Sequence, residues 1–158
     1  TELARQVGEA LLAQGETLAV AESCTGGWVA KCITDIAGSS QWFDRGFVTY
    51  TNAAKEAMLG VQAATLESAG AVSEATVTAM VTGVLHNSRA GCALAISGIA
   101  GPGGAVPGKP VGTVCFAWAR RGGRPQSETR RFTGDRDAVR RQAVAHALAG
   151  LLHVPGVD

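Results

Sequence analysis

The stretch AVAESCTGGWVAKCITDIAG, residues 19–38, joins an apolar run to a run with the pattern of a helix through a short polar bend. The apolar run predicts a buried strand over residues 17–21, and the later run predicts a helix over residues 28–36. The bend between them holds a serine, a cysteine, a threonine and two glycines, which predict a tight turn. Such a corner exposes its side chains and points the first N–H groups of the helix toward the same place.

Helix and strand patterns alternate along the rest of the chain. Helices are expected over residues 2–14, 28–36, 52–59, 65–69, 74–87 after an N-cap at Ser73, and 136–152, and strands over residues 17–21, 47–50, 92–97, 113–119 and 127–133. Several of these strands are apolar throughout, which is typical of strands buried on both faces. The order predicts an α/β fold, a three-layer α/β/α sandwich with a mixed, mostly parallel sheet and one antiparallel edge hairpin. No linker or repeat divides the chain, so residues 1–158 are expected to form a single domain.

Composition excludes several classes of protein. The chain has 158 residues, of which 46% are hydrophobic and 17% charged, as expected for a folded domain with a full core. A formal net charge of +1 gives no overall field that would favour nucleic acid or a membrane as a partner. The four cysteines form no C-x-x-C pair and the three histidines stand alone, so we expect neither a disulfide framework nor a metal site. Free thiols of this kind predict a cytoplasmic protein.

The bend contains a candidate nucleophile, Ser23. A serine nucleophile needs a base, and no histidine lies in a corner loop. Lys55 follows the strand expected over residues 47–50 by about one helical turn, and it is a candidate base because burial lowers the pKa of a lysine. Tyr50, at the expected end of that strand, should lie beside it. The alternatives are that Ser23 is a plain helix N-cap and that Lys55 is solvated.

Two other segments are candidates for binding. The loop GIAGPGGAVPGKPVG, residues 98–112, is longer than the about 4–6 residues that usually join two elements, and glycine-rich loops bind anions or planar rings through backbone groups. Arg136 and Arg140 lie one helical turn apart and are suited to binding a phosphate. The alternative for the loop is a flexible connector. The alternative for the arginines is a solvated helix face whose charge is neutralised by Asp135 and Asp137.

Five motifs, in this order, resemble the C-terminal domain of the competence/damage-inducible CinA proteins, a family that includes stand-alone nicotinamide-nucleotide amidohydrolases. The motifs are AESCTGG (21–27), GSSQWFDRGFVTYTNAAKEAMLGV (38–61), GAVSEATVTAM (70–80), AISGIAGPGG with KPVGTV (95–104 and 109–114) and FTGDRDAVR (132–140). The resemblance covers residues 3–152, nearly the whole chain.

The resemblance implies hydrolysis of the carboxamide of nicotinamide mononucleotide to nicotinic acid mononucleotide and ammonia, a reaction of pyridine-nucleotide salvage. It implies a Ser/Lys mechanism without a cofactor or metal, with Ser23 as the nucleophile, Lys55 as the general base and Tyr50 as an aid to positioning or proton transfer. The residues expected to bind the substrate are Thr25, Gly26, Gly27, Ser97, Gly98, Gly101, Arg136 and Arg140.

Within that set, N–H groups around residues 25–27 are expected to stabilise the oxyanion. Ser97 stands where many relatives have threonine, and both offer a hydroxyl. Arg136 is favoured over Arg140 for the phosphate. By chemistry Cys24 is a rival nucleophile, although the resemblance implies that it points into the fold.

Two other functions remain open from the sequence. The chain is alternatively a non-catalytic nucleotide-binding or regulatory module of a larger CinA-type protein, although pure binding does not require a lysine beside a serine. A factor linked to DNA is suggested only by the family's name, and the near-neutral charge argues against it. The family also implies a homo-oligomer, and neither a membrane nor nucleic acid is an expected partner.

Overall fold

The computed structural model describes residues 2–154, so residue 1 and residues 155–158, the two ends of the predicted domain, lie outside the described residues. The elements are, in chain order, α1 (Glu2–Gln14), β1 (Leu18–Glu22), α2 (Trp28–Thr34), η1 (Ser39–Gln41), β2 (Phe43–Val48), α3 (Asn52–Leu59), α4 (Ala63–Ala69), α5 (Glu74–His86), β3 (Cys92–Gly98), β4 (Thr113–Arg120), β5 (Gln126–Arg131) and α6 (Arg136–Leu151). None of these helices is long and apolar enough to cross a bilayer.

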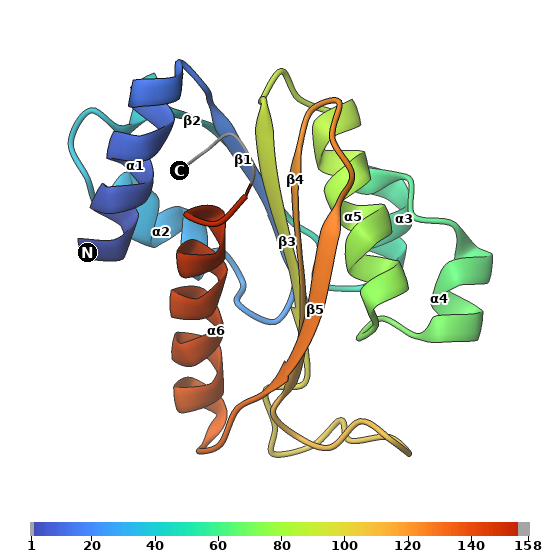
Figure 1. Ribbon diagram of the computed structural model, residues 1–158. Coiled ribbons are helices and arrows are strands. Elements are labelled where there is room, and N and C mark those ends of the chain that lie inside the picture. Colours follow the sequence, from blue (N-terminus) through green and yellow to red (C-terminus); the bar gives the residue numbers. More distant parts are fainter. Residues whose placement is uncertain (1, 155–158) are drawn as a thin grey trace.

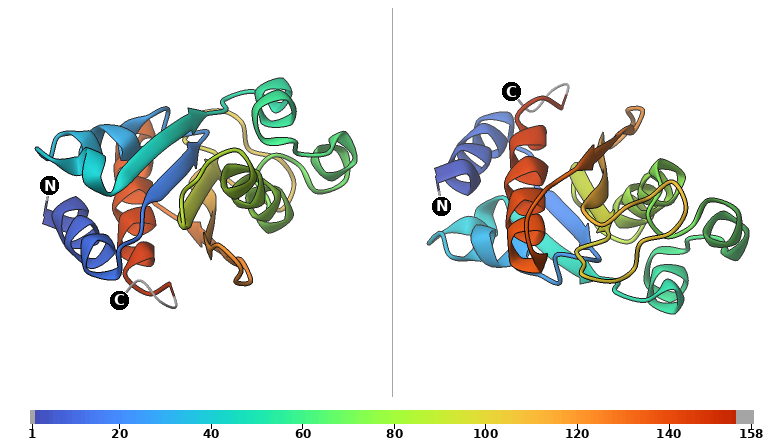
Figure 2. Two further views of the ribbon diagram at one scale, coloured as in Figure 1. Left: turned by 90° about the horizontal axis from the view of Figure 1, so that it is seen from above. Right: turned by 90° about the horizontal axis from the view of Figure 1, so that it is seen from below.

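One five-stranded sheet with the order β2-β1-β3-β4-β5 lies between two layers of helices (Figure 1). Strand β1 pairs in parallel with both β2 and β3, whereas β4 is antiparallel to both β3 and β5. Helices α1, α2 and α6 cover one face, and α3, α4 and α5 lie on the other side (Figures 1 and 2). The predicted three-layer sandwich with an antiparallel edge hairpin is therefore confirmed.

The two faces of the sheet carry side chains of different size. Toward α1, α2 and α6 the central strands present large apolar residues such as Leu94 and Phe116. Toward α5 they present mostly alanines, namely Ala19, Ala21, Ala93, Ala95, Ala117 and Ala119. A helix on such a surface packs close to the strands, since methyl groups fill little space. Helix α5 contacts β1, β3 and β4, and α3 packs on α5.

Strand β2 was predicted at residues 47–50 but is found at Phe43–Val48. It is an edge strand, and its first residues, including Asp44 and Arg45, are exposed, so they lack the apolar pattern on which the prediction rested. Tyr50 consequently lies beyond the strand, in the bend before α3, and is not its last residue. The other elements begin and end within two residues of their predicted limits.

The parallel strands end at the same edge of the sheet. Ser23 directly follows β1, Ser97 is the next-to-last residue of β3, and the bend at residues 49–50 follows β2. The N–H of Thr49 donates to the carbonyl of Glu22 at 2.9 Å, which extends the pairing of β1 and β2 by one bond beyond β2. This hydrogen bond brings the bend beside Ser23, at the carboxyl ends of the strands where ligands of open α/β sheets bind.

Candidate active site

Ser23 and Lys55 meet at this edge of the sheet. The Nζ of Lys55 lies 3.0 Å from the Oγ of Ser23, and it also donates to the carbonyls of Thr49 at 3.0 Å and Tyr50 at 3.4 Å. The residues Ser23 and Lys55 are only 6% and 1% exposed. Burial lowers the pKa of Lys55, because it disfavours the charged amine. In the neutral amine, two N–H groups bound to the two carbonyls leave the lone pair facing the serine hydroxyl.

The start of α3 positions Lys55. The side-chain oxygen of Thr51 accepts a hydrogen bond from the N–H of Ala54 at 3.1 Å, and this N-cap fixes the first turn of the helix at Asn52. Lys55 therefore lies in the first turn, only a few residues after the carbonyls that its amine contacts.

Glu22, the last residue of β1, fixes the bend from inside the fold. Its carboxylate is buried and accepts hydrogen bonds from the hydroxyl of Thr25 at 2.6 Å and from the N–H groups of Val29 at 2.9 Å and Ala30 at 3.0 Å. These amides belong to the first turn of α2, so the carboxylate takes the place of a conventional cap. The hydroxyl of Thr25 is engaged inside the fold. Sequence reasoning missed this role of Glu22, for which the only signal was a carboxylate at the end of an apolar run.

Arg140 fixes the same bend from outside. Its Nε donates to the carbonyl of Cys24 at 2.9 Å and its Nη2 to the carbonyl of Thr25 at 3.3 Å. The guanidinium lies over the ring of Trp28, 5.6 Å from the centroid, in a cation–π arrangement. Arg140 therefore helps to hold the bend that follows Ser23.

The glycines of the bend allow this conformation. Gly26 and Gly27 have φ angles of +58° and +104°, in the region that favours glycine. The N–H of Gly26 donates to the carbonyl of Ser23 at 3.1 Å, so it is already used within the turn. A separate hollow beside Trp28, which does not include Ser23 or Lys55, is lined by Thr25, Gly26, Gly27 and Arg140. These four residues thus lie outside the cavity at Ser23 and Lys55, and their contact with a substrate stays a prediction.

A cavity of about 340 Å³ opens above Ser23 and Lys55. Of the predicted site residues, its walls contain Ser23, Tyr50, Lys55, Ser97, Gly98, Gly101 and Arg136. The walls also contain Cys24, the rival nucleophile, and further residues of the candidate loop 98–112, namely Ile99, Ala100, Gly103 and Gly104. Sequence reasoning missed Asn52, Ala71 and Val72. Asn52 offers an amide at the first position of α3, and its place beside the helix cap was the signal that could have identified it. Within residues 2–154, no group of three or more potential ligands is arranged to hold a metal ion.

Arg136 bridges two walls of the cavity. Its Nη1 donates to the carbonyl of Gly101 at 2.7 Å and its Nη2 to the phenol oxygen of Tyr50 at 3.1 Å. Tyr50 is 57% exposed, so its ring lies at the rim, and its contact with Ser23 and Lys55 is made by its backbone carbonyl. The predicted positioning role of Tyr50 is thus available through the main chain.

Cys24 is a poor nucleophile in this setting. It is buried within the apolar core, and burial raises the pKa of its thiol to about 12. The nucleophilic form of cysteine is the thiolate, which the raised pKa disfavours at neutral pH.

Replacing Glu22 by glutamine should destabilise the protein, because an NH₂ group then replaces one carboxylate oxygen. This donor would face a backbone N–H, that of Val29 or Ala30, which now has no acceptor. We expect the Glu22→Gln variant to lose about 1–3 kcal/mol of unfolding free energy, as for other unsatisfied buried groups. Urea denaturation measures this loss. Glu56→Gln, at an exposed position of α3, is the matched control. Equal unfolding curves for the two variants would show that the carboxylate does not hold the bend.

Comparison with known proteins gives the family of this chain. The model of the CinA C-terminal domain matches residues 1–154. The nicotinamide-nucleotide amidohydrolase PncC of Escherichia coli (strain K12) is 59% identical over 150 residues, which are 95% of this chain and 91% of that protein. PncC of Pseudomonas putida is 51% identical over 154 residues, with 98% and 96% of the two chains covered. The chain belongs to the CinA C-terminal domain family, as its motifs indicated.

Longer proteins and solved structures are also similar. A putative competence-damage inducible protein of Symbiobacterium thermophilum is 54% identical over 155 residues, but the match covers only 36% of its length. The crystal structure of the competence damage-inducible protein A (ComA) from Klebsiella pneumoniae subsp. pneumoniae MGH 78578 superposes with a TM-score of 0.93 at 43% identity, covering 96% of this chain and 94% of that one. The domain therefore occurs both alone and as part of longer chains.

Proposed function

We propose that this protein hydrolyses the carboxamide of nicotinamide mononucleotide to nicotinic acid mononucleotide and ammonia through a Ser/Lys mechanism. The observation that carries the proposal is the 3.0 Å contact between Ser23 Oγ and a buried Lys55 whose amine is also held by two carbonyls. The choice of substrate is supported by relatives named nicotinamide-nucleotide amidohydrolase that match over nearly their whole lengths.

The reaction has two halves. Neutral Lys55 removes the hydroxyl proton as Ser23 Oγ bonds to the amide carbon, and the lysine then gives that proton to the amide nitrogen as the C–N bond breaks and ammonia leaves. In the second half Lys55 takes a proton from water, the resulting hydroxide attacks the ester carbon, and the proton returns to Ser23 Oγ as the carboxylic acid is released. Lys55 ends neutral, and no other proton carrier is needed.

The oxyanion requires a donor beside the nucleophile. Gly26 was among the candidates, but its N–H is bound to the carbonyl of Ser23. The N–H of Cys24 adjoins the nucleophile, and the hydrogen bonds found within residues 2–154 do not use it. We assign the oxyanion to this N–H, because Cys24 lies in the cavity wall, whereas Thr25, Gly26 and Gly27 line a different hollow.

Arg136 is the residue we assign to the substrate's phosphate. Arg136 and Lys55 are the cationic side chains that line the cavity, and the mechanism requires Lys55 to be neutral. Arg140 is bound to the carbonyls of the bend and lies outside the cavity walls, which favours Arg136. A planar guanidinium at the rim can bind a phosphate in a bidentate manner while the carboxamide lies at Ser23.

The test is ammonia release from nicotinamide mononucleotide by the purified protein, without added metal and with a chelator present. We expect multiple turnovers, and much slower release from nicotinamide riboside, which lacks the phosphate that Arg136 would bind. Binding of the mononucleotide without ammonia release would contradict the proposal and favour the non-catalytic nucleotide-binding module.

A further inference from the structure

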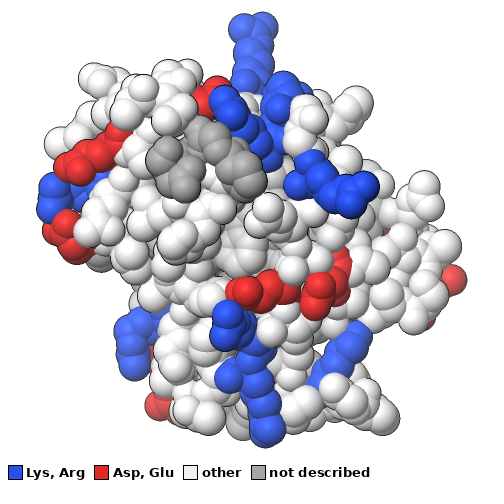
Figure 3. Space-filling view, viewed as in Figure 1, with Lys and Arg blue, Asp and Glu red and all other residues white. Residues whose placement is uncertain are grey.

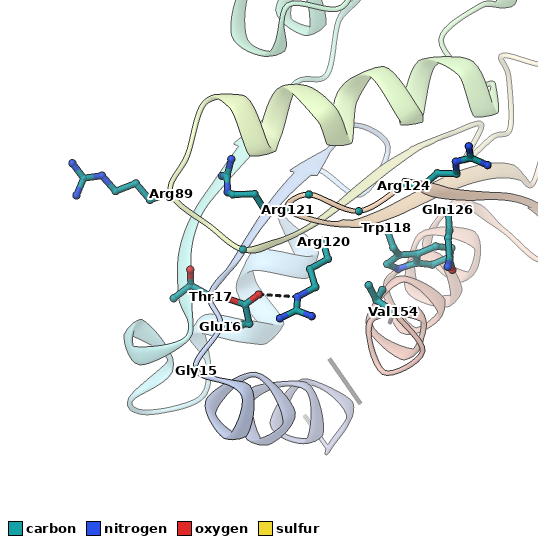
Figure 4. A pocket seen from close by; sticks show the side chains of 13 residues that line it. Gly15, Glu16, Thr17, Arg89, Trp118, Arg120, Arg121, Arg124, Gln126 and Val154 are labelled. Carbon is teal, nitrogen blue, oxygen red and sulfur yellow. Dashed lines mark hydrogen bonds and ion pairs between the residues drawn. The ribbon is translucent and has the colours of Figure 1, made fainter. Parts of the chain in front are cut away.

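A second hollow lies at the opposite end of the sheet from Ser23. Its volume is about 710 Å³, roughly twice that of the candidate active site. Residues 15–17 before β1, Gly91 before β3 and the turn between β4 and β5 form its walls (Figure 4). Strands β1 and β3 thus begin at this hollow and end at the candidate active site, so the two cavities are separated by the length of the sheet.

Positive charge is concentrated around this hollow. Its walls contain four arginines and one carboxylate, that of Glu16, whereas the whole chain has a formal net charge of only +1. Figure 3 shows basic side chains at the end of the molecule that carries the β4–β5 turn, and a second group at the opposite end. The four arginines are Arg89, Arg120, Arg121 and Arg124. A concave surface with charge of one sign attracts ligands of the opposite sign.

Two of these arginines have structural roles. Arg120 donates from its Nε to Glu16 at 3.1 Å, which joins the β4 end to the segment before β1. Arg121 donates from its Nε and Nη2 to three backbone carbonyls. They are that of Leu85, near the end of α5, and those of Ser88 and Ala90, which follow it. These bonds hold the walls of the hollow together and give a structural role to two of its four arginines.

The other two arginines have no such role within the part of the chain that the structure describes. Arg89 and Arg124 are exposed, and neither forms a hydrogen bond or ion pair with residues 2–154. Figure 4 shows them on opposite sides of the hollow, pointing outward from its rim. An extended chain of negative charges offers one group to each of them.

The floor between them favours a ligand recognised by charge. Trp118 is almost fully buried and its indole N–H donates to the carbonyl of Ala147 at 3.0 Å, so its ring is not available for stacking on a base. The backbone is exposed in the turn at Gly122, which has a φ of +84°, whereas Gly91 lies against the carboxylate of Glu16. Arginine side chains and exposed backbone are the groups that bind phosphates.

We propose that this hollow binds the phosphate chain of a polyphosphate ligand, either an inorganic polyphosphate or a nucleoside polyphosphate. Arg89 and Arg124 contact the two ends of the chain, and the N–H groups of Arg120 that Glu16 does not use contact its middle. The site is distinct from the cavity at Ser23.

Titration calorimetry with sodium tripolyphosphate, at low and at physiological salt, tests the proposal. We expect one site per chain, an affinity that falls with salt, and a loss of at least about tenfold in the Arg89→Gln/Arg124→Gln variant. The matched control is Arg130→Gln/Arg141→Gln, which removes the same charge from exposed positions on β5 and α6 and should change the affinity by less than about twofold. Circular dichroism confirms that each variant is folded.

Absence of binding to the wild type, or equal weakening in both double variants, would overturn the proposal. Loss of binding in Arg136→Gln, with full binding in Arg89→Gln/Arg124→Gln, would also overturn it, because the anion would then occupy the candidate active site. Comparison with ATP distinguishes the sources of the chain: equal affinities support an inorganic polyphosphate, and tighter binding of ATP supports a nucleoside polyphosphate.

Discussion

We expect the Ser23→Ala variant to release ammonia from nicotinamide mononucleotide on the order of 10⁴-fold more slowly than the wild type, or not at all. The hydroxyl is the group that Lys55 contacts at 3.0 Å, and alanine leaves no atom to form the acyl-enzyme. Losses of this size are typical when a covalent nucleophile is removed. The fold should survive, because the side chain is small and lies at the cavity floor.

Cys24→Ala is the control for this experiment. Its thiol is protonated because its pKa is raised to about 12, so we expect its removal to reduce turnover by less than about tenfold. The rates of both variants are measured by ammonia release, and their folding by circular dichroism. The reverse outcome, with an active Ser23→Ala and an inactive Cys24→Ala protein, would assign the nucleophile to the cysteine.

The Lys55→Met variant should lose turnover to a similar extent, since methionine fills the space without offering a base. In the wild type we expect kcat/KM to rise with pH as Lys55 loses its proton, with a midpoint below the ordinary lysine pKa of 10.5, because burial lowers the pKa of this amine. Lys55→Arg should not restore activity, because a guanidinium stays charged. Lys31→Met is the control, at an exposed lysine of α2 that pairs with Asp35.

Stability provides an independent measure of the same pKa. When Lys55 is buried it binds a proton less readily than in the unfolded chain, so the unfolded state gains protons first as pH falls. The free energy of unfolding therefore decreases as pH falls from 10.5 to the lowered pKa of the folded state, and is constant below it. Urea unfolding across this range measures the contribution of Lys55 as the difference in slope between the wild type and Lys55→Met, because buried thiols such as Cys24, whose pKa is raised, add the opposite slope to both proteins. An identical slope in both proteins would mean that the pKa of Lys55 is not lowered.

Most of the fold was predictable because its strands are buried. The runs at residues 92–97 and 113–119 are apolar on both faces, and they were found as β3 and β4 nearly to the residue. Strand β2 was not, because an edge strand with exposed polar residues has no apolar pattern to detect. The structure also contains η1, a single turn of 3-10 helix that no periodicity could reveal.

The candidate site was predictable where a residue required a chemical partner and the sequence offered one at a suitable position. Ser23 needed a base, and Lys55 was the lysine at a neighbouring strand end, a pairing that the geometry supports. Contacts that cross the fold were not predictable: Arg140 reaches the carbonyl of Cys24 across 116 positions, and no local pattern distinguishes it from Arg136. Glu22 was missed for a related reason, since a buried carboxylate is recognised only by the amides that surround it.

The alanines beneath α5 have a consequence for the chemistry at some distance from them. Helix α3 carries Lys55 and packs on α5, and α5 rests on methyl groups such as those of Ala93 and Ala95. The separation of Lys55 and Ser23 therefore depends on side chains of one carbon beneath α5. We expect a larger residue at any of these positions to displace α5 and α3 and to lengthen the 3.0 Å contact on which the proposed proton transfer depends.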